Sequence, residues 1–120
     1  MPSRKQSPRT RRVADRIQLE LAEILNARTE DPRLRTLTVT GAEVSRDLSI
    51  AKVWVSGTPV AEEPHVLQAL EKAAPYFRSL LAPRLKLRIV PQIHFLIDHS
   101  LEAGARIDQL LREIQEPRDD

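Results

Sequence analysis

The chain has 120 residues, a formal net charge of +2 and no cysteine. Its length suits a single domain with a hydrophobic core. Without cysteine, neither a disulfide framework nor a thiolate metal site can form. No apolar run is long enough to cross a bilayer, and residues 1–12, with Met1 as their only large apolar side chain, do not match a secretory signal. We therefore expect a soluble cytoplasmic protein with no membrane partner.

The nearly neutral total conceals segregated charges. Residues 1–12 contain five basic residues and no acidic one, and residues 72–97 again contain five basic residues and no acidic one. Residues 98–120 contain seven acidic residues and three basic ones. A chain that concentrates positive charge in this way suits a polyanionic partner. The alternative is an ordinary solvated surface, which charge runs usually form.

The first elements that we expect are a helix and a β-hairpin. Residues 1–8 are polar and predict a disordered basic arm, and apolar residues at helical spacing predict a helix over 9–28. The exposed face of this helix should carry Arg9, Arg12, Arg16, Glu20 and Glu23. Strands over 37–45 and 49–56 form an antiparallel hairpin, with a bulge at Gly41 where the apolar phase changes. The second strand is almost continuously apolar, which favours a central position in the sheet.

Prolines divide the next part of the chain. Pro64 is well placed to open a helix. Pro75 should interrupt that helix, because proline has no N–H to donate and its ring clashes with the preceding turn. A short second helix then ends at Pro83. A last helix should follow Ser100 as its N-cap and fray over 116–120.

Residues 85–97 alternate between apolar odd positions and mostly polar even positions. This period predicts a β-strand with one apolar face. Pro91 removes a ladder donor, which indicates either an edge position for the strand or a bulge. Lys86 and Arg88 make the leading end of its polar face basic.

These elements predict an α+β domain over residues 9–115, in the order helix, strand, strand, helix, kink, helix, strand and C-terminal helix. The 28 residues between the second and third strands allow a parallel, right-handed crossover. We therefore expect a mixed three-stranded sheet with helices packed on it.

The order of elements resembles a type II KH domain. Several segments resemble, more narrowly, the ribosome-binding factor A family of bacterial assembly factors for the small ribosomal subunit: Arg12–Ile17, Asp31–Leu34, Val44–Ser56, Leu87–Ser100 and Gly104–Leu111. The similarity spans about residues 10–112, which is nearly the whole predicted fold.

The resemblance implies a non-catalytic factor that binds free small (30S) subunits and 16S rRNA late in their maturation. It also implies support for 16S rRNA processing and for growth in the cold, with a GTPase that releases the factor as a further candidate partner. We expect a monomer. The family lacks the Gly-x-x-Gly clamp of other KH domains and kinks its central helices at an Ala-x-Gly element. Here Ala73, Ala74 and Pro75 occupy that element, so proline replaces the glycine.

The RNA-binding residues that we expect come from the basic stretches. Four of them surround the kink and the start of the last strand, where they would hold phosphates: Arg78, Arg84, Lys86 and Arg88. Four others would extend this surface from the hairpin and the first helix: Arg46, Lys52, Arg9 and Arg12. The alternative roles are solubility, protection of a sheet edge and surface ion pairs such as Arg46 with Asp47.

Base readout and catalysis have little support. The chain has one Trp, one Tyr and two Phe, and sequence-specific RNA modules usually expose several rings. We therefore expect recognition of RNA backbone and shape, with Trp54 in a packing role. Asp98, His99 and Ser100 are the residue types of a hydrolytic triad, but consecutive residues cannot converge on one substrate.

We also expect no metal and no cofactor. The three histidines, His65, His94 and His99, lack metal-site spacing, and no glycine-rich phosphate loop is present. The alternative to RNA binding is a protein-interaction module that recruits a partner through the edge strand or the last helix. A hydrolase has no support among the motifs.

Overall fold

The structure, a computed structural model, describes residues 7–100. Its elements in chain order are α1 (Pro8–Ala27), α2 (Pro32–Arg35), β1 (Thr38–Val44), β2 (Ile50–Ser56), the 3-10 turn η1 (Val60–Glu62), α3 (Glu63–Leu85) and β3 (Gln92–Ile97). The predicted basic arm and the predicted last helix with its frayed end lie outside the described residues, apart from Ser7, Pro8 and Ser100. No helix within the described range is long and apolar enough to cross a membrane.

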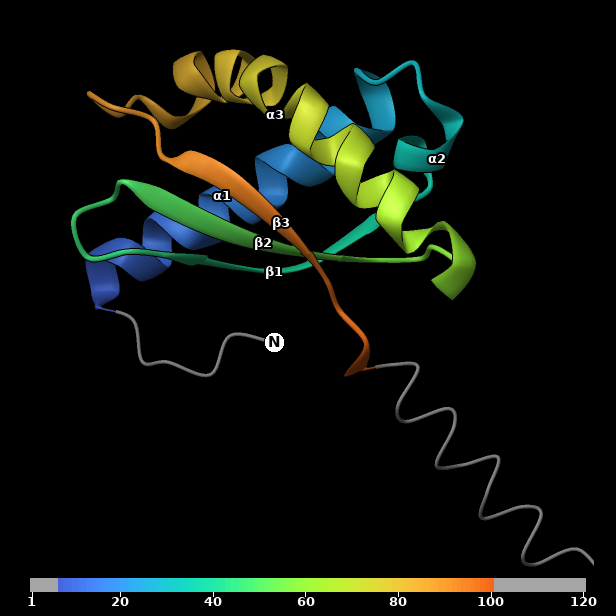
Figure 1. Cartoon of the computed structure of the whole chain (residues 1–120). Helices are drawn as coiled ribbons and strands as arrows, with labels where there is room; N and C mark the ends of the chain where they lie inside the picture. Colours follow the sequence, from blue (N-terminus) through green and yellow to red (C-terminus); the bar gives the residue numbers. More distant parts are fainter. Residues whose placement is uncertain (1–6, 101–120) are drawn as a thin grey trace, which may run out of the picture.

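The sheet confirms the predicted topology. β1 pairs with β2 in an antiparallel hairpin, β2 pairs with β3 in parallel, and the strand order is β1-β2-β3. The register shifts between Val39 and Gly41, where the sequence predicted a bulge. The long crossover through α3 carries the chain from β2 to β3, and α1 and α3 pack on the sheet and on each other (Figure 1). The α+β class with a mixed three-stranded sheet is therefore confirmed.

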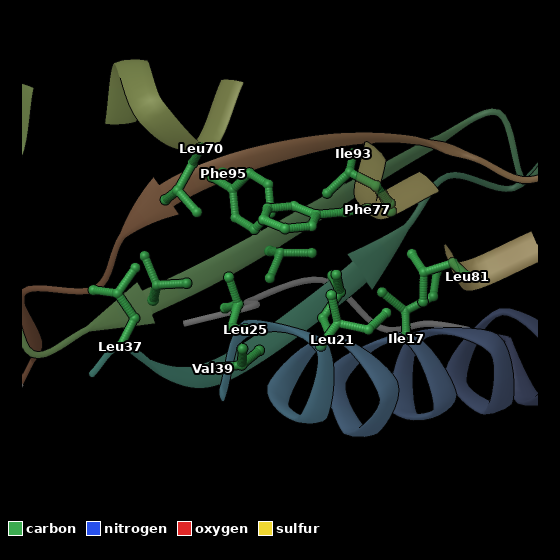
Figure 2. Packing of buried hydrophobic residues seen from close by; sticks show 14 of the residues in the cluster. Ile17, Leu21, Leu25, Leu37, Val39, Leu70, Phe77, Leu81, Ile93 and Phe95 are labelled. Atoms are coloured by element: carbon green, nitrogen blue, oxygen red, sulfur yellow. The ribbon is translucent and has the colours of Figure 1, made fainter. Parts of the chain in front are cut away.

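The core lies between the two long helices and one face of the sheet. Ile17, Leu21 and Leu25 of α1 are fully buried, and Phe77 of α3 is buried with them (Figure 2). The ring of Phe77 meets that of Phe95 edge-on, with centroids 6.0 Å apart and planes 76° apart. This is a favoured geometry for aromatic pairs, and it fixes α3 over β3.

Helix α1 begins one residue earlier than predicted. The Ser7 hydroxyl accepts a hydrogen bond from the Thr10 N–H at 3.2 Å, and Pro8 occupies the first helical turn, where its missing N–H costs nothing.

The predicted exposure of one residue on the polar face of α1 is wrong. Glu20 is only 9% exposed, because α3 packs beside it and supplies a cation.

Helix α3 does not break at its prolines. The helix runs from Glu63 to Leu85 with Pro75 and Pro83 inside it, so the predicted interruption at Pro75 and the predicted end at Pro83 are wrong. The ribbon instead changes direction near its middle (Figure 1). A proline removes one hydrogen bond and bends a helix that is held on both sides. Here Leu70 before Pro75 and Phe77 after it are both fully buried.

The last strand is shorter than predicted. β3 spans only Gln92–Ile97, and residues 86–91, here called the connector, lie outside it. Lys86 follows α3 in the left-handed conformation, with φ 54°. Pro91 is fully buried just before β3, so it is not an interior strand residue, although β3 does lie at the edge of the sheet. The sequence alternation over 85–91 is not matched by alternating burial, because Leu85 and Val90 pack against the core whereas Ile89 is exposed.

Candidate nucleic-acid interface

A groove runs between the second half of α3, the connector and β3. Its volume is about 760 Å³, and its lining includes Pro75, Arg78 and Ser79 of α3, Arg88 and Ile89 of the connector, and His94 of β3. Ile89 was expected on the apolar face, but it is 69% exposed and lies on the groove wall. The groove therefore combines apolar surface, cations and the edge of a sheet.

The edge of β3 adds backbone groups to this groove. The N–H groups of Gln92 and Asp98 donate to Ser49 and Val55 on the β2 side at 2.9 and 2.8 Å. Along a parallel strand, successive residues direct their N–H and C=O groups to opposite sides. Ile93, which follows Gln92 and lines the groove, therefore directs its N–H and C=O away from β2. Donors and acceptors on a strand edge can serve a ligand that lies along it.

Arg78 shapes the groove from within. Its guanidinium donates two hydrogen bonds to the Val90 carbonyl oxygen, from Nε at 3.0 Å and from Nη2 at 2.6 Å. A carbonyl outside the sheet ladder needs such a donor when it is partly buried. Arg78 therefore ties the connector to α3, and its charge is directed at the protein's own backbone.

Arg84 has a similar internal role. Its Nη1 lies 2.9 Å from Glu20 Oε2 and 3.3 Å from Glu23 Oε2, and its side chain is 22% exposed. The hydrogen bond to Glu20 is the main cause that raises the pKa of Arg84. Arg16 holds the other oxygen of Glu20 at 3.1 Å. Arg84 therefore joins the end of α3 to α1 through Glu20 and Glu23.

Lys86 and Arg88 are different, because both side chains are exposed on the connector. Within residues 7–100, neither has an ion-pair partner. Arg88 lines the groove directly, and Lys86 lies two residues away, where α3 ends. In the described part of the chain, therefore, no ion pair has to break before these two cations bind an anion.

Three other predicted residues lie at the same end of the molecule. The start of α1, with Arg9 and Arg12, and the hairpin turn, with Arg46, lie at the end where the connector enters β3 (Figure 1). The hydrogen bond from Gln92 to Ser49 joins the turn to β3 directly. All three arginines are exposed. The fold thus brings together cations from three separate parts of the sequence.

The hairpin turn leaves Arg46 without its expected partner. Asp47 Oδ1 accepts from the Ser49 hydroxyl at 2.7 Å, from the Ser45 hydroxyl at 2.8 Å and from the Ser49 N–H at 3.1 Å. These bonds, the Ser49 hydroxyl first, lower the pKa of Asp47. No ion pair joins Arg46 to Asp47 in the part of the chain that the structure describes.

Lys52 and Trp54 lie on the sheet face that points away from the helices. Lys52 is exposed, with Glu43 and His94 as its neighbours across the two ladders. Trp54 is half-buried and lies outside the buried core, because strand residues alternate and its neighbours Val53 and Val55 point inward. Trp54 therefore does not belong to the main hydrophobic core, where a packing residue would be expected. Neither residue lines the groove.

Asp98, His99 and Ser100 form no catalytic arrangement. Asp98 accepts from the Thr40 hydroxyl at 2.7 Å and from the Ser100 N–H at 2.9 Å, whereas His99 lies 2.8 Å from Glu63. Hydrogen bonds from Ser100 and then from Thr40 lower the pKa of Asp98 to about 2. Asp98 thus fastens the end of β3 to β1. Over residues 7–100, no three His, Asp or Glu side chains group as metal ligands would.

Sequence similarity identifies the family. The family model for ribosome-binding factor A matches residues 9–111. A ribosome-binding factor A of Nitrosospira multiformis is 44% identical over 106 residues, which cover 88% of this chain and 84% of that protein. One from Shewanella baltica is 45% identical over 114 residues, covering 92% of this chain and 71% of that protein.

Solved structures agree with this result. The crystal structure of ribosome-binding factor A from Thermus thermophilus has a TM-score of 0.66 and 34% identity, covering 73% of this chain and 94% of that one. A homology model of the Thermus thermophilus factor, fitted into a cryo-EM map of a 30S–RbfA complex, has a TM-score of 0.60 and 35% identity, covering 72% and 91%. The fold and the matched residues together place this chain in the ribosome-binding factor A family.

Proposed function

We propose that this protein is a non-catalytic maturation factor that binds the free small (30S) ribosomal subunit through 16S rRNA. The observation that carries this proposal is the groove beside β3, where Arg88 and nearby Lys86 are exposed cations that form no ion pair with any described residue. Support for the 30S subunit comes from the Thermus relative, whose fitted structure belongs to a 30S–RbfA complex.

The groove favours contact with the RNA backbone. Phosphates would lie against Lys86 and Arg88, and Arg9, Arg12 and Arg46 would extend the contact at the same end of the molecule. Arg78 and Arg84 would act indirectly, since their guanidinium groups hold the connector and α1 in place. Such an interface positions the protein on RNA and reads its shape more than its sequence.

Finer parts of the function are proposals as well. By holding immature RNA in one conformation, the protein would support late assembly and 16S rRNA processing, and this help would matter most in the cold. It would act as a monomer in the cytoplasm and leave the subunit with the help of a GTPase. A deletion strain complemented with this chain, grown at low temperature and assayed for unprocessed 16S rRNA, would test these parts together.

Pelleting with purified small subunits across a salt series tests the binding proposal. A binder with about six phosphate contacts should lose roughly a thousandfold in affinity between about 50 and 200 mM salt. Reversing both charges, Lys86→Glu with Arg88→Glu, should lower affinity by on the order of a hundredfold. It should also reduce the salt slope, which is the slope of log affinity against log salt concentration, by about two.

The matched control is Arg35→Glu against Arg88→Glu alone. Both arginines are exposed, but Arg35 lies on α2, away from the connector (Figure 1). We expect Arg35→Glu to weaken binding much less than Arg88→Glu does. Wild-type affinity in a folded Lys86→Glu, Arg88→Glu variant would refute this site. Salt-insensitive binding of the wild type would instead favour a protein-interaction module.

A further inference from the structure

A second hollow lies on another side of α3. Its volume is about 630 Å³, and it is bordered by α3, the end of α1 and the segment that contains α2. Lys72 and Tyr76 of α3 line this hollow, whereas their sequence neighbours Glu71 and Pro75 line the groove. Consecutive helix residues point about 100° apart. Helix α3 therefore lies between the hollow and the groove, which are separated by little more than the width of the helix.

Tyr76 gives the hollow an open aromatic surface. The residue is 49% exposed, although Leu34 and Phe77 beside it in the lining are buried. The Phe77 ring lies 6.1 Å from the Tyr76 ring, at an angle of 46°. The Tyr76 ring is thus flanked by the core and open toward solvent. A ring that is held in this way and is still accessible can stack on a nucleobase.

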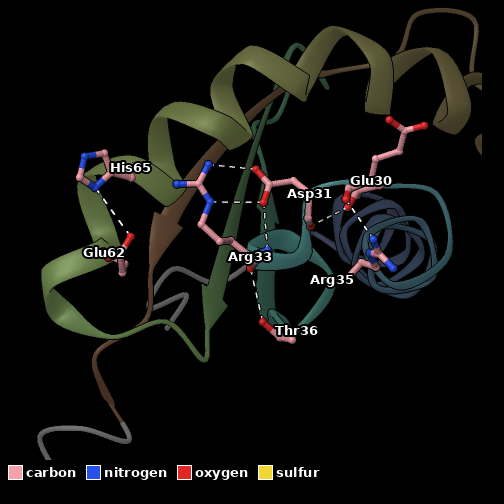
Figure 3. A network of polar contacts seen from close by, with 8 residues as sticks. Glu30, Asp31, Arg33, Arg35, Thr36, Glu62 and His65 are labelled. Carbon is pink, nitrogen blue, oxygen red and sulfur yellow. Dashed lines mark hydrogen bonds and ion pairs between the residues drawn. The ribbon is translucent and has the colours of Figure 1, made fainter.

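The charges around the hollow leave two cations available. Arg33 donates to both carboxylate oxygens of Asp31, at 3.2 Å from Nε and 3.0 Å from Nη2 (Figure 3). This contact lowers the pKa of Asp31, and the opposite charges of the two side chains offset each other. Arg28 and Lys72 are exposed and have no ion-pair partner among the described residues. Apart from Asp31, the lining contains one carboxylate, Glu30, so these two cations leave the hollow with an excess of positive charge.

We propose that this hollow binds one unstacked nucleotide of the RNA strand whose neighbouring phosphates lie in the groove. The base stacks on Tyr76, and Lys72 and Arg28 hold the adjoining phosphates. This inference rests on the proposed function, because it places a second contact on the same RNA. A nucleotide fits better than a peptide, since the hollow joins one stacking surface to two cations that are unpaired within residues 7–100. Stacking uses the face of a base, so it adds affinity with little sequence preference.

The comparison of Tyr76→Leu with Tyr76→Phe tests the stacking contact. Leucine keeps apolar bulk without a ring, whereas phenylalanine keeps the ring without the hydroxyl. We expect Tyr76→Leu to bind small subunits about tenfold more weakly, with an unchanged salt slope, and Tyr76→Phe to retain wild-type affinity. We expect Lys72→Gln to reduce the salt slope by about one.

The same titrations on protein-free 16S rRNA separate the possible outcomes. If the wild type binds neither small subunits nor 16S rRNA, the proposed function itself fails. If the wild type binds both and a folded Tyr76→Leu variant binds as tightly, the nucleotide site is refuted. If Tyr76→Leu weakens binding to subunits but not to protein-free RNA, the hollow holds a segment of protein and the inference is overturned.

Discussion

Four basic side chains lie between residues 78 and 88, and they divide into two kinds. Arg78 and Arg84, on α3, are bonded to groups of the protein itself, whereas Lys86 and Arg88, on the connector, are exposed and have no such partner among residues 7–100. The first kind stabilises the fold, and the second kind is exposed to solvent. Local charge density alone does not distinguish them.

The difference follows from the backbone that carries each pair. Residues 86–91 are irregular, so the Val90 carbonyl lacks a ladder partner, and Arg78 reaches across to supply the donors. Arg84 meets Glu20, which is 64 positions earlier in the chain and nearly buried. Both partners are created by tertiary structure, and neither is a sequence neighbour of the arginine that it binds.

The largest effect should come from Arg78→Leu. The change leaves the Val90 carbonyl without its charged donor, and such bonds contribute about 1.5–3 kcal/mol. We expect a loss of that order in the free energy of unfolding, measured by urea denaturation. Binding to small subunits should also weaken, because the connector that carries Arg88 is no longer fixed.

Arg88→Leu is the matched control for that prediction. Both variants lose one arginine, but Arg88 is exposed and has no described internal partner, so its loss should change the free energy of unfolding by less than about 0.5 kcal/mol. A similar stability in the two variants would show that Arg78 and Arg88 are alike and would break the comparison.

The far end of β3 offers a second comparison, because a carboxylate holds it. Asp98 accepts from Thr40 and Ser100, and these bonds lower its pKa from 3.8 to about 2. A carboxyl group with a lowered pKa in the folded state stabilises the fold above its unfolded pKa. This contribution is lost as the pH falls from about 4 to about 2.

We therefore expect Asp98→Asn to cost about 1–2 kcal/mol at pH 7, since an amide replaces a charged acceptor. The gap between the two proteins should narrow as the pH falls through the window from about 4 to about 2, where wild-type Asp98 takes up its proton. Thermal unfolding at several pH values measures this gap. A gap that stays constant with pH would show that the carboxylate charge plays no part.

Much of the fold was predictable because it depends on short-range patterns. Val53 and Val55 fall on one face of the second predicted strand and are fully buried there, and the phase change at Gly41 located the bulge. The near-continuous apolarity of β2 indicated its central position, and the crossover length indicated parallel pairing. These signals need no knowledge of distant contacts.

The errors arose where tertiary contacts decide local structure. The apolar and polar residues alternate over 85–91, but burial does not follow this alternation, since Ile89 is 69% exposed. Periodicity alone therefore could not separate a strand from an irregular connector. Pro75 bends α3 without ending it, because buried residues on both sides hold the helix to the core. Tyr76 received no role, although its exposure beside buried Phe77 marks it in the structure.

The smallest effect should come from Lys86→Gly, which we expect to stabilise the fold and to weaken binding to small subunits. Lys86 adopts φ 54°, a conformation that costs a residue with a β-carbon about 1 kcal/mol and that glycine adopts freely. We expect Lys86→Gly to raise the free energy of unfolding by about 0.5 kcal/mol, after the greater freedom of glycine in the unfolded chain is included. The same change should reduce the salt slope of subunit binding by about one, because it removes a cation.

Lys86→Ala is the control, and it should weaken binding equally without the gain in stability. If glycine stabilises the fold and leaves binding unchanged, Lys86 serves only to end α3, and Arg88 remains as the sole connector cation for a phosphate.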